Sequence, residues 1–299
     1  MAKRNIMLFI KLQGGLGNQM FQYAFASILA KKNSTSVFID ASFFERTEKR
    51  LGFTPRKFEL AIFNNEYTLA SNADILSFHY LSKIHKVKKK LGFCYPKIYV
   101  ESTFGFQVDA LSIQSPVYLK GYFQSYKYLV GYEGLIRQLF SFPVDKLDDI
   151  NNELLIKIKN SKSISVHIRR GDYVNDEKTA QYHGSCSLDY YLEAIKLLSS
   201  KNMDLTLVFF SDDSDWVKEQ FNDLPYSKIV VDYNNDENSW KDMLLMSFCS
   251  HNIIANSSFS WWAAWLNANP EKTVIAPKNW FRTKDLDTTT LLPEEWIKI

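Results

Sequence analysis

The sequence predicts an α/β protein with two Rossmann-like domains that face each other across a cleft. In the second half, short apolar, β-branched runs alternate with stretches of helical period, and the chain opens with a similar order of strand, glycine loop and helix. Strands that alternate with helices imply right-handed βαβ units and a parallel sheet. The 299 residues suffice for two domains, and we expect the division near Pro143, between domains 1–143 and 144–299.

The first domain starts regularly, and its middle stretch, 41–116, shows no clear period and holds many aromatic residues. Regular hydrophobic patterns lie on either side of that stretch. The elements expected there are a strand over 5–12, a helix that ends at about Lys32, strands over 35–39 and 117–120, and a helix over 126–140.

The second domain has the clearest pattern of the chain. Strands are expected at 164–168, 205–210, 228–231, 252–255 and 273–276, and helices at 188–198, 215–221, 240–249 and 259–267. The polar stretch 145–152 precedes the first of these strands and is interpreted as part of the boundary.

The charge balance argues against a dedicated nucleic-acid binder. A net charge of +3 is mild, whereas such binders carry a stronger and more localised excess. The one basic run, Lys83–Lys90, is interpreted as a solvated helix face. The alternative is a contact with anionic lipid headgroups or with an anionic, lipid-linked substrate.

The cysteines and the N-terminus favour a cytoplasmic protein. Cys94, Cys186 and Cys249 are odd in number and widely spaced, so they predict neither a disulfide framework nor a zinc site. The N-terminal apolar run is broken by Lys11 and lacks a small-residue cleavage site, which favours a buried strand over a signal peptide. No stretch approaches the ~20 apolar residues of a membrane span. Peripheral contact with the inner membrane face through the basic run stays open.

Polar residues gather where the expected strands of the second domain end. These clusters are His167 to Asp172, Ser211-Asp212-Asp213, Asp232-Tyr233 and Asn256-Ser257-Ser258. Ligands of open α/β sheets bind outside the carboxyl ends of the strands. The clusters therefore predict a binding site at this edge.

The segment HIRRGDY, His167 to Tyr173, has the chemistry of a diphosphate grip. Alternation along the strand places His167 and Arg169 on one face, and Gly171 permits a turn that brings Asp172 back towards them. The planar fork of arginine suits a bidentate contact with phosphate and stays charged at every physiological pH. The alternative is a structural ion pair between arginine and aspartate at a strand end.

Two further clusters suit parts of a nucleotide. Ser257 and Ser258 stand before an expected helix, where hydroxyl and N–H groups could hold an anion, or where one serine is an ordinary N-cap. A carboxylate of Asp212 or Asp213 could accept from N1–H and N2–H of guanine, although one of the two could instead cap the next helix.

The N-terminal glycine loop is not a dinucleotide fingerprint. Gly15 and Gly17 follow a strand, but Met20 stands where that fingerprint needs a small residue for close helix–strand packing. Close approach of the loop backbone to a phosphate or a sugar remains the expected use of Gly14 and Gly15.

Four segments taken together, GGLGNQMFQYAFA, HIRRGDYV, FFSDD and NSSFSWWAAWL, resemble in order and spacing the bacterial α-1,2-fucosyltransferases of glycosyltransferase family 11. This family lies within the superfamily that shares an HxRRxD motif. The resemblance covers most of the chain and weakens over 41–116. It implies a GT-B-like fold, a GDP-β-L-fucose donor, transfer with inversion to the 2-hydroxyl of a galactose in an oligosaccharide or glycolipid, and no divalent metal.

The resemblance also suggests roles for single residues. His167 and one of Asp212 and Asp213 would contact guanine. Arg169 would hold the β-phosphate, near Gly14, Gly15 and one of Ser257 and Ser258, and would supply the positive charge that a metal supplies elsewhere. Asp172 would orient the arginines or the donor. The candidates for a base that removes the acceptor proton are Asp172, Asp176 and Glu177.

Two other functions are weighed beside this one. The first is a GDP-sugar transferase with another donor or linkage. The second is a non-catalytic protein that binds sugar nucleotides or glycans, which the charged residues at every strand end disfavour.

Overall fold

The computed structural model describes residues 7–45, 55–65, 67–80, 83–91, 95–171, 184–199, 204–283 and 286–299. The chain forms two compact units, with the described residues 7–45, 55–141 and 286–291 in the first and 142–283 and 292–299 in the second. The short return of 286–291 to the first unit was not predicted. Thr290 holds it there, because its carbonyl accepts the N–H of Tyr126 at 3.1 Å and the hydroxyl of Ser125 at 2.8 Å.

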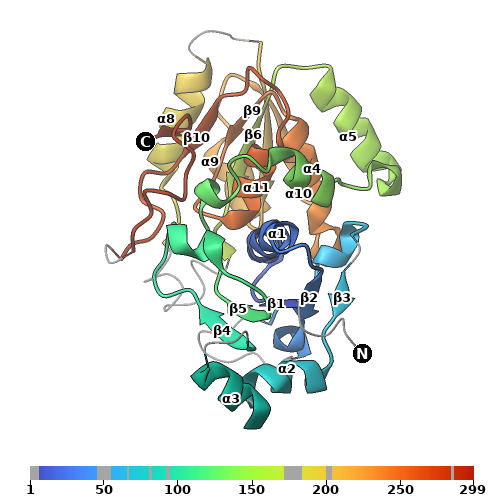
Figure 1. Cartoon of the computed structure of the whole chain (residues 1–299). Coiled ribbons are helices and arrows are strands. Elements are labelled where there is room, and N and C mark those ends of the chain that lie inside the picture. The colour runs from blue at the N-terminus through green and yellow to red at the C-terminus, as the bar shows by residue number, and fades with distance from the viewer. Residues whose placement is uncertain are drawn as a thin grey trace. The chain divides into compact units, whose positions relative to one another are not determined.

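The first unit is built on a five-stranded parallel sheet with the order β3-β2-β1-β5-β4. Its strands are β1 (Leu8–Lys11), β2 (Val37–Asp40), β3 (Thr68–Leu69), β4 (Lys97–Val100) and β5 (Val117–Lys120). Its helices are α1 (Leu16–Lys32), α2 (Asn72–His79), α3 (Lys83–Lys90) and α4 (Glu133–Leu139), with 3-10 turns at Ser42–Glu45, Leu60–Ile62, Val108–Ser112 and Tyr126–Tyr128. Figure 1 shows α1 and α2 on opposite faces of this sheet.

The second unit is built on a six-stranded sheet with the order β11-β10-β9-β6-β7-β8, and every pair in it is parallel. Its strands are β6 (Ser163–Ile168), β7 (Thr206–Ser211), β8 (Ser227–Val231), β9 (His251–Ile253), β10 (Val274–Ala276) and β11 (Ile297–Lys298). Its helices are α5 (Asp149–Lys159), α8 (Leu188–Ser199), α9 (Ser214–Gln220), α10 (Ser239–Phe248) and α11 (Ser258–Leu266), with 3-10 turns at Val144–Lys146 and Asp236–Asn238.

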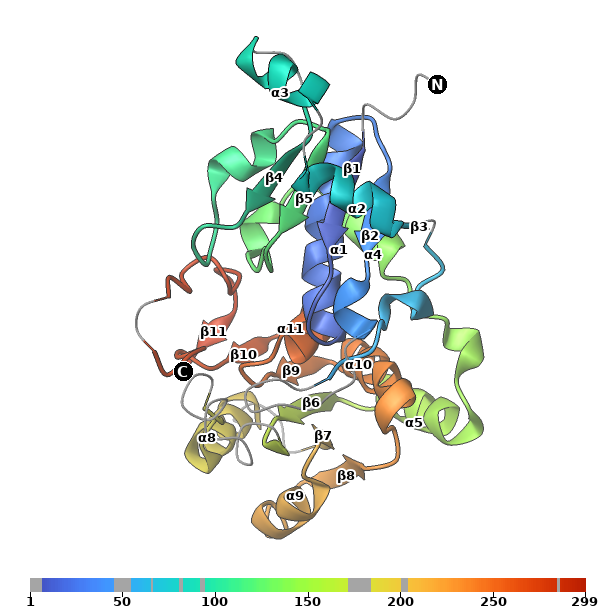
Figure 2. The same cartoon turned by 90° about the horizontal axis from the view of Figure 1, so that it is seen from below.

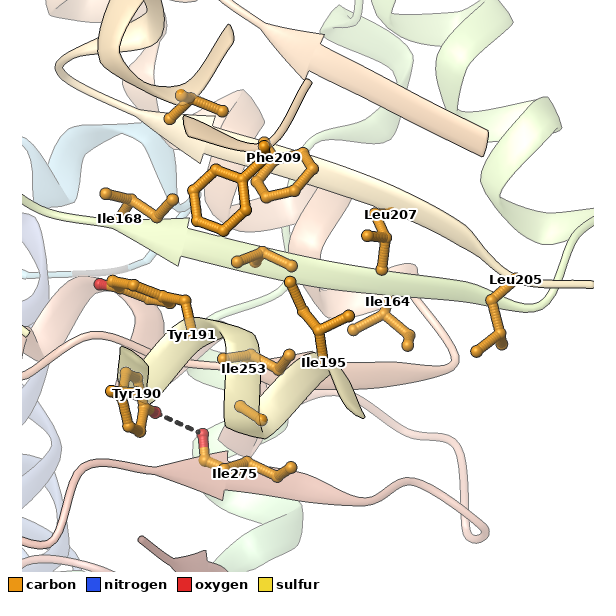
Figure 3. Packing of buried hydrophobic residues seen from close by; sticks show 14 residues of the cluster. Ile164, Ile168, Tyr190, Tyr191, Ile195, Leu205, Leu207, Phe209, Ile253 and Ile275 are labelled. Carbon is orange, nitrogen blue, oxygen red and sulfur yellow. Dashed lines mark hydrogen bonds between the residues drawn. The ribbon is translucent and has the colours of Figure 1, made fainter. Parts of the chain in front are cut away.

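Helices cover both faces of the second sheet, as a Rossmann-like domain requires. Figure 2 shows α8 and α9 on one side and α10 and α11 on the other. In Figure 3, Tyr191 and Ile195 of α8 pack on Ile164 and Ile168 of β6. Both of these isoleucines are fully buried. The prediction of parallel, Rossmann-like α/β units is confirmed.

Two elements differ from the expectations. The helix expected over 126–140 is interrupted, because Gly131 adopts a left-handed backbone angle of 81° between the 3-10 turn and α4. The stretch assigned to a polar boundary contains the start of α5, which Asp148 caps by accepting the N–H of Asn151. Burial of Leu154 and Leu155 stabilises this helix despite its polar composition.

Candidate active site

The carboxyl ends of β6 and β9 form the topological switch point of the second sheet. From β6 the chain proceeds outward through β7 to β8, and then returns to β9 on the other side of β6. Helices that follow the two central strands leave on opposite faces, so a crevice for ligands opens at this point in such sheets. The predicted clusters at His167–Arg169 and at Asn256–Ser258 follow these two strands.

His167 lies on the strand face predicted for it. Ile164, Val166 and Ile168 join the core with α8, whereas the His167 ring lies 5.7 Å from the Phe259 ring of α11. Burial is the main cause that lowers the pKa of His167 to about 4; Asp212 acts in the opposite direction, and nearby Arg169 adds to the decrease. The imidazole is therefore neutral at pH 7, and its Nδ1 has no hydrogen-bond partner among the described residues.

The two arginines of the motif have different surroundings. Arg169 Nη1 lies 2.9 Å from Asp212 Oδ2, and both side chains are about a quarter exposed (26% and 24%). Arg170 Nε lies 3.0 Å from Asp213 Oδ2, and its guanidinium lies 4.1 Å from the centre of the Trp216 ring. The stack and the ion pair give Arg170 a structural role.

Asp212 also holds the turn after β6 through the turn's backbone, whereas Asp213 contacts the backbone of the next helix. Asp212 Oδ1 accepts the N–H of Arg170 at 2.8 Å, and a Cβ on Gly171 would lie only 2.8 Å from Asp212 Oδ2. Glycine is needed there for this close approach. Asp213 caps α9 through the N–H of Trp216, as one of the two alternatives anticipated.

Both arginines of the motif thus form ion pairs with aspartates, as the structural alternative proposed. The aspartates in these pairs, Asp212 and Asp213, follow β7. Asp172, Asp176 and Glu177 lie outside the described residues. A contact of Asp212 or Asp213 with guanine stays a prediction, and it would have to share carboxylate oxygens that arginines already contact.

The third cluster starts α11. Ser257 is its N-cap and accepts the N–H of Phe259 at 3.3 Å, and Ser258 is the first helical residue. Asn256, which is 3% exposed, donates to the carbonyls of Gly184 and Trp280. It thereby fixes two loops beside the strand end, a role not assigned from the sequence.

The glycine loop lies at the switch point of the first sheet, where the strand order reverses between β1 and β5. Gly14 has a backbone φ of 82°, and a Cβ there would come 2.4 Å from Asn18 Nδ2, so only glycine fits. Gly15 is the N-cap of α1 and offers no side chain for capping.

Two glutamines of α1, to which the sequence assigned no role, hold this loop. Gln22 accepts the N–H of Gln13 and donates to the Gly121 carbonyl after β5. Gln19 donates to the carbonyls of Gly14 and Lys57. Both glutamines are fully buried. Their place at i and i+3 in GNQMFQY is the sequence signal that they share one helix face.

Glu59 is a further residue that the sequence did not single out. Gln19 Oε1 accepts its N–H at 2.9 Å, and its carboxylate accepts the N–H of Leu16 in the first turn of α1. Burial raises the pKa of Glu59, and Arg56 and the Leu16 N–H act in the opposite direction. A carboxylate is thus already present at this helix N-terminus.

The predicted site residues belong to both units. Gly14 and Gly15 lie in the first, whereas His167, Arg169, Asp212, Asp213, Ser257 and Ser258 lie at three neighbouring strand ends of the second. Among the described residues, no three His, Cys, Asp or Glu side chains are arranged to hold a metal ion.

The family model described as Glycosyl transferase family 11 matches residues 1–299. The chain belongs to glycosyl transferase family 11. It is therefore a glycosyltransferase of the family that its motifs resemble.

Two relatives from Escherichia coli match almost the whole chain. The O-antigen biosynthesis glycosyltransferase WbnK is 33% identical, over 96% of this chain and 99% of the relative. An α-1,2-colitosyltransferase is 31% identical, over 97% of each.

The crystal structure of POFUT1 in complex with GDP is similar over 92% of this chain and 99% of that chain, with a TM-score of 0.51 and 13% identity. At this identity the likeness concerns the fold alone, and it agrees with the GT-B-like class expected from the sequence. None of the described helices of this family 11 member is long and apolar enough to span a membrane.

Proposed function

We propose that this family 11 member transfers L-fucose from GDP-β-L-fucose to the 2-hydroxyl of a galactose residue, with inversion to an α-1,2 linkage. The observation that carries the proposal is the position of Arg169. It follows the central strand at the switch point of the second sheet and is oriented by Asp212. A held guanidinium at that edge suits the diphosphate of a sugar nucleotide.

In the proposed reaction, the acceptor oxygen bonds to fucose C1 while the bond from C1 to the β-phosphate oxygen breaks. The electron pair of that bond leaves with GDP, and Arg169 stabilises the negative charge that develops there. Arg169 thereby supplies the charge compensation that a divalent metal would supply, so we propose a metal-independent transfer. The acceptor proton passes to a carboxylate or to water.

The donor contacts that we propose combine the predicted residues with the observed surroundings. His167 is neutral at pH 7, and Ser257 and Ser258 start α11, where N–H groups and hydroxyls favour an anion. Asp212 acts on the donor through Arg169. Gly14 and Gly15 offer backbone for close approach, but the Glu59 carboxylate beside them repels a phosphate, so a sugar fits this loop better. We accordingly assign acceptor binding to the first unit.

A second donor is favoured by one specific observation. The relative at 31% identity is named an α-1,2-colitosyltransferase. Colitose is L-fucose without its 3-hydroxyl. A site that hydrogen-bonds this hydroxyl would reject the deoxy sugar by a factor of ~10⁴ or more, whereas a merely apolar site would hardly discriminate.

The test is incubation of the protein with GDP-L-fucose, with GDP-colitose and with no donor, each with a panel of β-galactosides. The products are then analysed for linkage and anomeric configuration. The proposal expects an α-1,2-fucosylated galactose and a much lower kcat/KM with GDP-colitose. A higher kcat/KM with GDP-colitose would assign the second donor, and no transfer to any galactoside would refute both.

A further inference from the structure

The segment from Ile75 to Val100 has a charge unlike that of the rest of the chain. It contains six lysines and no Asp or Glu, so the remaining sequence, with 30 Lys and Arg against 33 Asp and Glu, is net negative. The mild overall charge therefore hides a strongly basic region, which α3 (Lys83–Lys90) forms in large part.

Helix α3 separates its lysines from its apolar side chains. Ile84, Val87 and Leu91 recur at helical spacing and share one face, and the N–H of Leu91 bonds to the Val87 carbonyl at 3.0 Å, which continues the turn. These side chains are 69%, 54% and 65% exposed in the structure. The exposed lysines Lys83, Lys86, Lys89 and Lys90 lie on the rest of the helix surface.

Many of the exposed apolar residues lie in the same stretch of the sequence as this helix. Of the 17 large hydrophobic residues that are exposed in the described part of the chain, eight lie between residues 69 and 100. They are Leu69, Leu76, Tyr80, Ile84, Val87, Leu91, Ile98 and Val100. Leu69 in β3 and the pair Ile98 and Val100 in β4 lie at opposite edges of the sheet, so the eight residues do not form one patch. The apolar stripe of α3, beside an uncompensated basic run, is what indicates an interaction surface.

Helix α2, which precedes α3 in the sequence, packs firmly on the sheet of its unit. In α2, the Phe78 ring lies 4.9 Å from the Phe9 ring of β1, and Ile75 joins the same cluster. The opposite side of α2 presents Leu76, which is 51% exposed. In Figures 1 and 2, α3 lies at the edge of the first unit.

We propose that α3 docks this protein on the surface of an anionic lipid bilayer. A short helix with an apolar stripe and a lysine-rich polar face lies in the interfacial plane, with its apolar side chains among the acyl chains and its lysines at the headgroups. A bilayer takes up both features at once, because it is apolar below and negatively charged above. This inference goes beyond the transfer reaction and would bring the enzyme to lipid-linked acceptors.

The test is flotation of the full-length protein with vesicles of phosphatidylcholine alone and of phosphatidylcholine with 30% phosphatidylglycerol. We expect the protein to bind the anionic vesicles and not those of phosphatidylcholine alone, and we expect salt to weaken this binding. Each lysine near the surface contributes about fivefold in affinity. The variant with Lys83, Lys86, Lys89 and Lys90 all changed to Gln should therefore bind at least ~100-fold more weakly. The variant with Ile84, Val87 and Leu91 changed to Ser should also lose binding.

The control lies on α5, which also exposes an isoleucine next to lysines. The variant with Ile156→Ser, Lys157→Gln and Lys159→Gln removes comparable side chains from the second unit. It should bind vesicles like the unaltered protein.

Absence of binding to the anionic vesicles would overturn the proposal, as would α3 variants that bind as well as the unaltered protein. The assay contains no sugar nucleotide, so its outcome is independent of the proposed reaction. A cooperative thermal melt with a Tm near that of the unaltered protein verifies that each variant is folded.

Discussion

The neighbouring arginines of the HxRRxD motif should respond in opposite ways to truncation. Arg169→Ala removes the guanidinium that we assign to the leaving diphosphate, and Arg170→Ala removes one that pairs with Asp213 and stacks on Trp216. The two changes are chemically identical and lie one residue apart. Their different effects therefore report on position alone.

The expected losses of stability follow from the contacts of each side chain. Arg169 forms an ion pair whose partners are a quarter exposed, and such a pair is worth up to about 1 kcal/mol. Arg170 adds a stack on Trp216, worth about 1 kcal/mol more, to a similar pair. A unit of this size loses roughly 2–4 °C in Tm per kcal/mol. We expect a decrease of up to about 4 °C for Arg169→Ala and about 4–8 °C for Arg170→Ala.

The expected losses of activity have the opposite order. Loss of a key transition-state donor lowers turnover by at least ~10²-fold, so Arg169→Ala should show this loss in kcat at temperatures well below its Tm. Arg170→Ala should retain more activity, because the Asp212 pair of Arg169 remains in place. The assays are thermal melting and steady-state transfer from GDP-fucose. A near-normal kcat for Arg169→Ala, or equal losses of activity in both variants, would refute the assignment.

Three further predictions concern the donor, the metal and a buried acid. GDP should raise the Tm and UDP or ADP should not; equal shifts for all three would exclude selection of guanine. Transfer should proceed unchanged in EDTA, and activity that EDTA abolishes and magnesium restores would contradict the metal-free mechanism. Desolvation raises the pKa of Asp242 to about 7, from 3.8, while Asn234 donates to its Oδ1 at 2.8 Å. A raised folded-state pKa gives stability that is complete below the unfolded-state pKa and lost as pH rises through 7. Asp242→Asn should therefore raise the free energy of unfolding by about 1 kcal/mol or more at pH 8 and change it little at pH 3.5. An equal gain in the free energy of unfolding at both pH values would show that the carboxyl charge is not the cause.

Much of the second unit was predictable because its sheet is buried on both faces. Such strands appear as continuous apolar, β-branched runs, and β6 to β10 all begin and end within two residues of the expected ranges. Alternation along β6 correctly placed His167 opposite Ile164 and Ile168. These are local properties, which a sequence records directly.

In the first unit, the elements before and after the stretch 41–116 were predictable, and those within it were not. The 17-residue α1 and the strand β5 match their expected ranges closely, because both are buried and strongly patterned. The stretch between β2 and β5 holds short elements with little burial, such as β3, both of whose residues are exposed. Without a buried face there is no hydrophobic period to detect.

The sequence by itself determined the parallel α/β class and the face on which His167 lies, and it predicted the segments of the candidate site. Only the tertiary structure decided which side chains form ion pairs and buried hydrogen bonds with one another. Asp212 and Asp213 hold the arginines from more than 40 residues away, and Gln19 is buried because backbone carbonyls of Gly14 and Lys57 satisfy its amide. A residue's type and spacing specify local geometry, but ion pairs and buried hydrogen bonds depend on strand order, which brings distant segments together. The HxRRxD segment can therefore be found in the sequence, whereas the different partners of its two arginines are set by the fold.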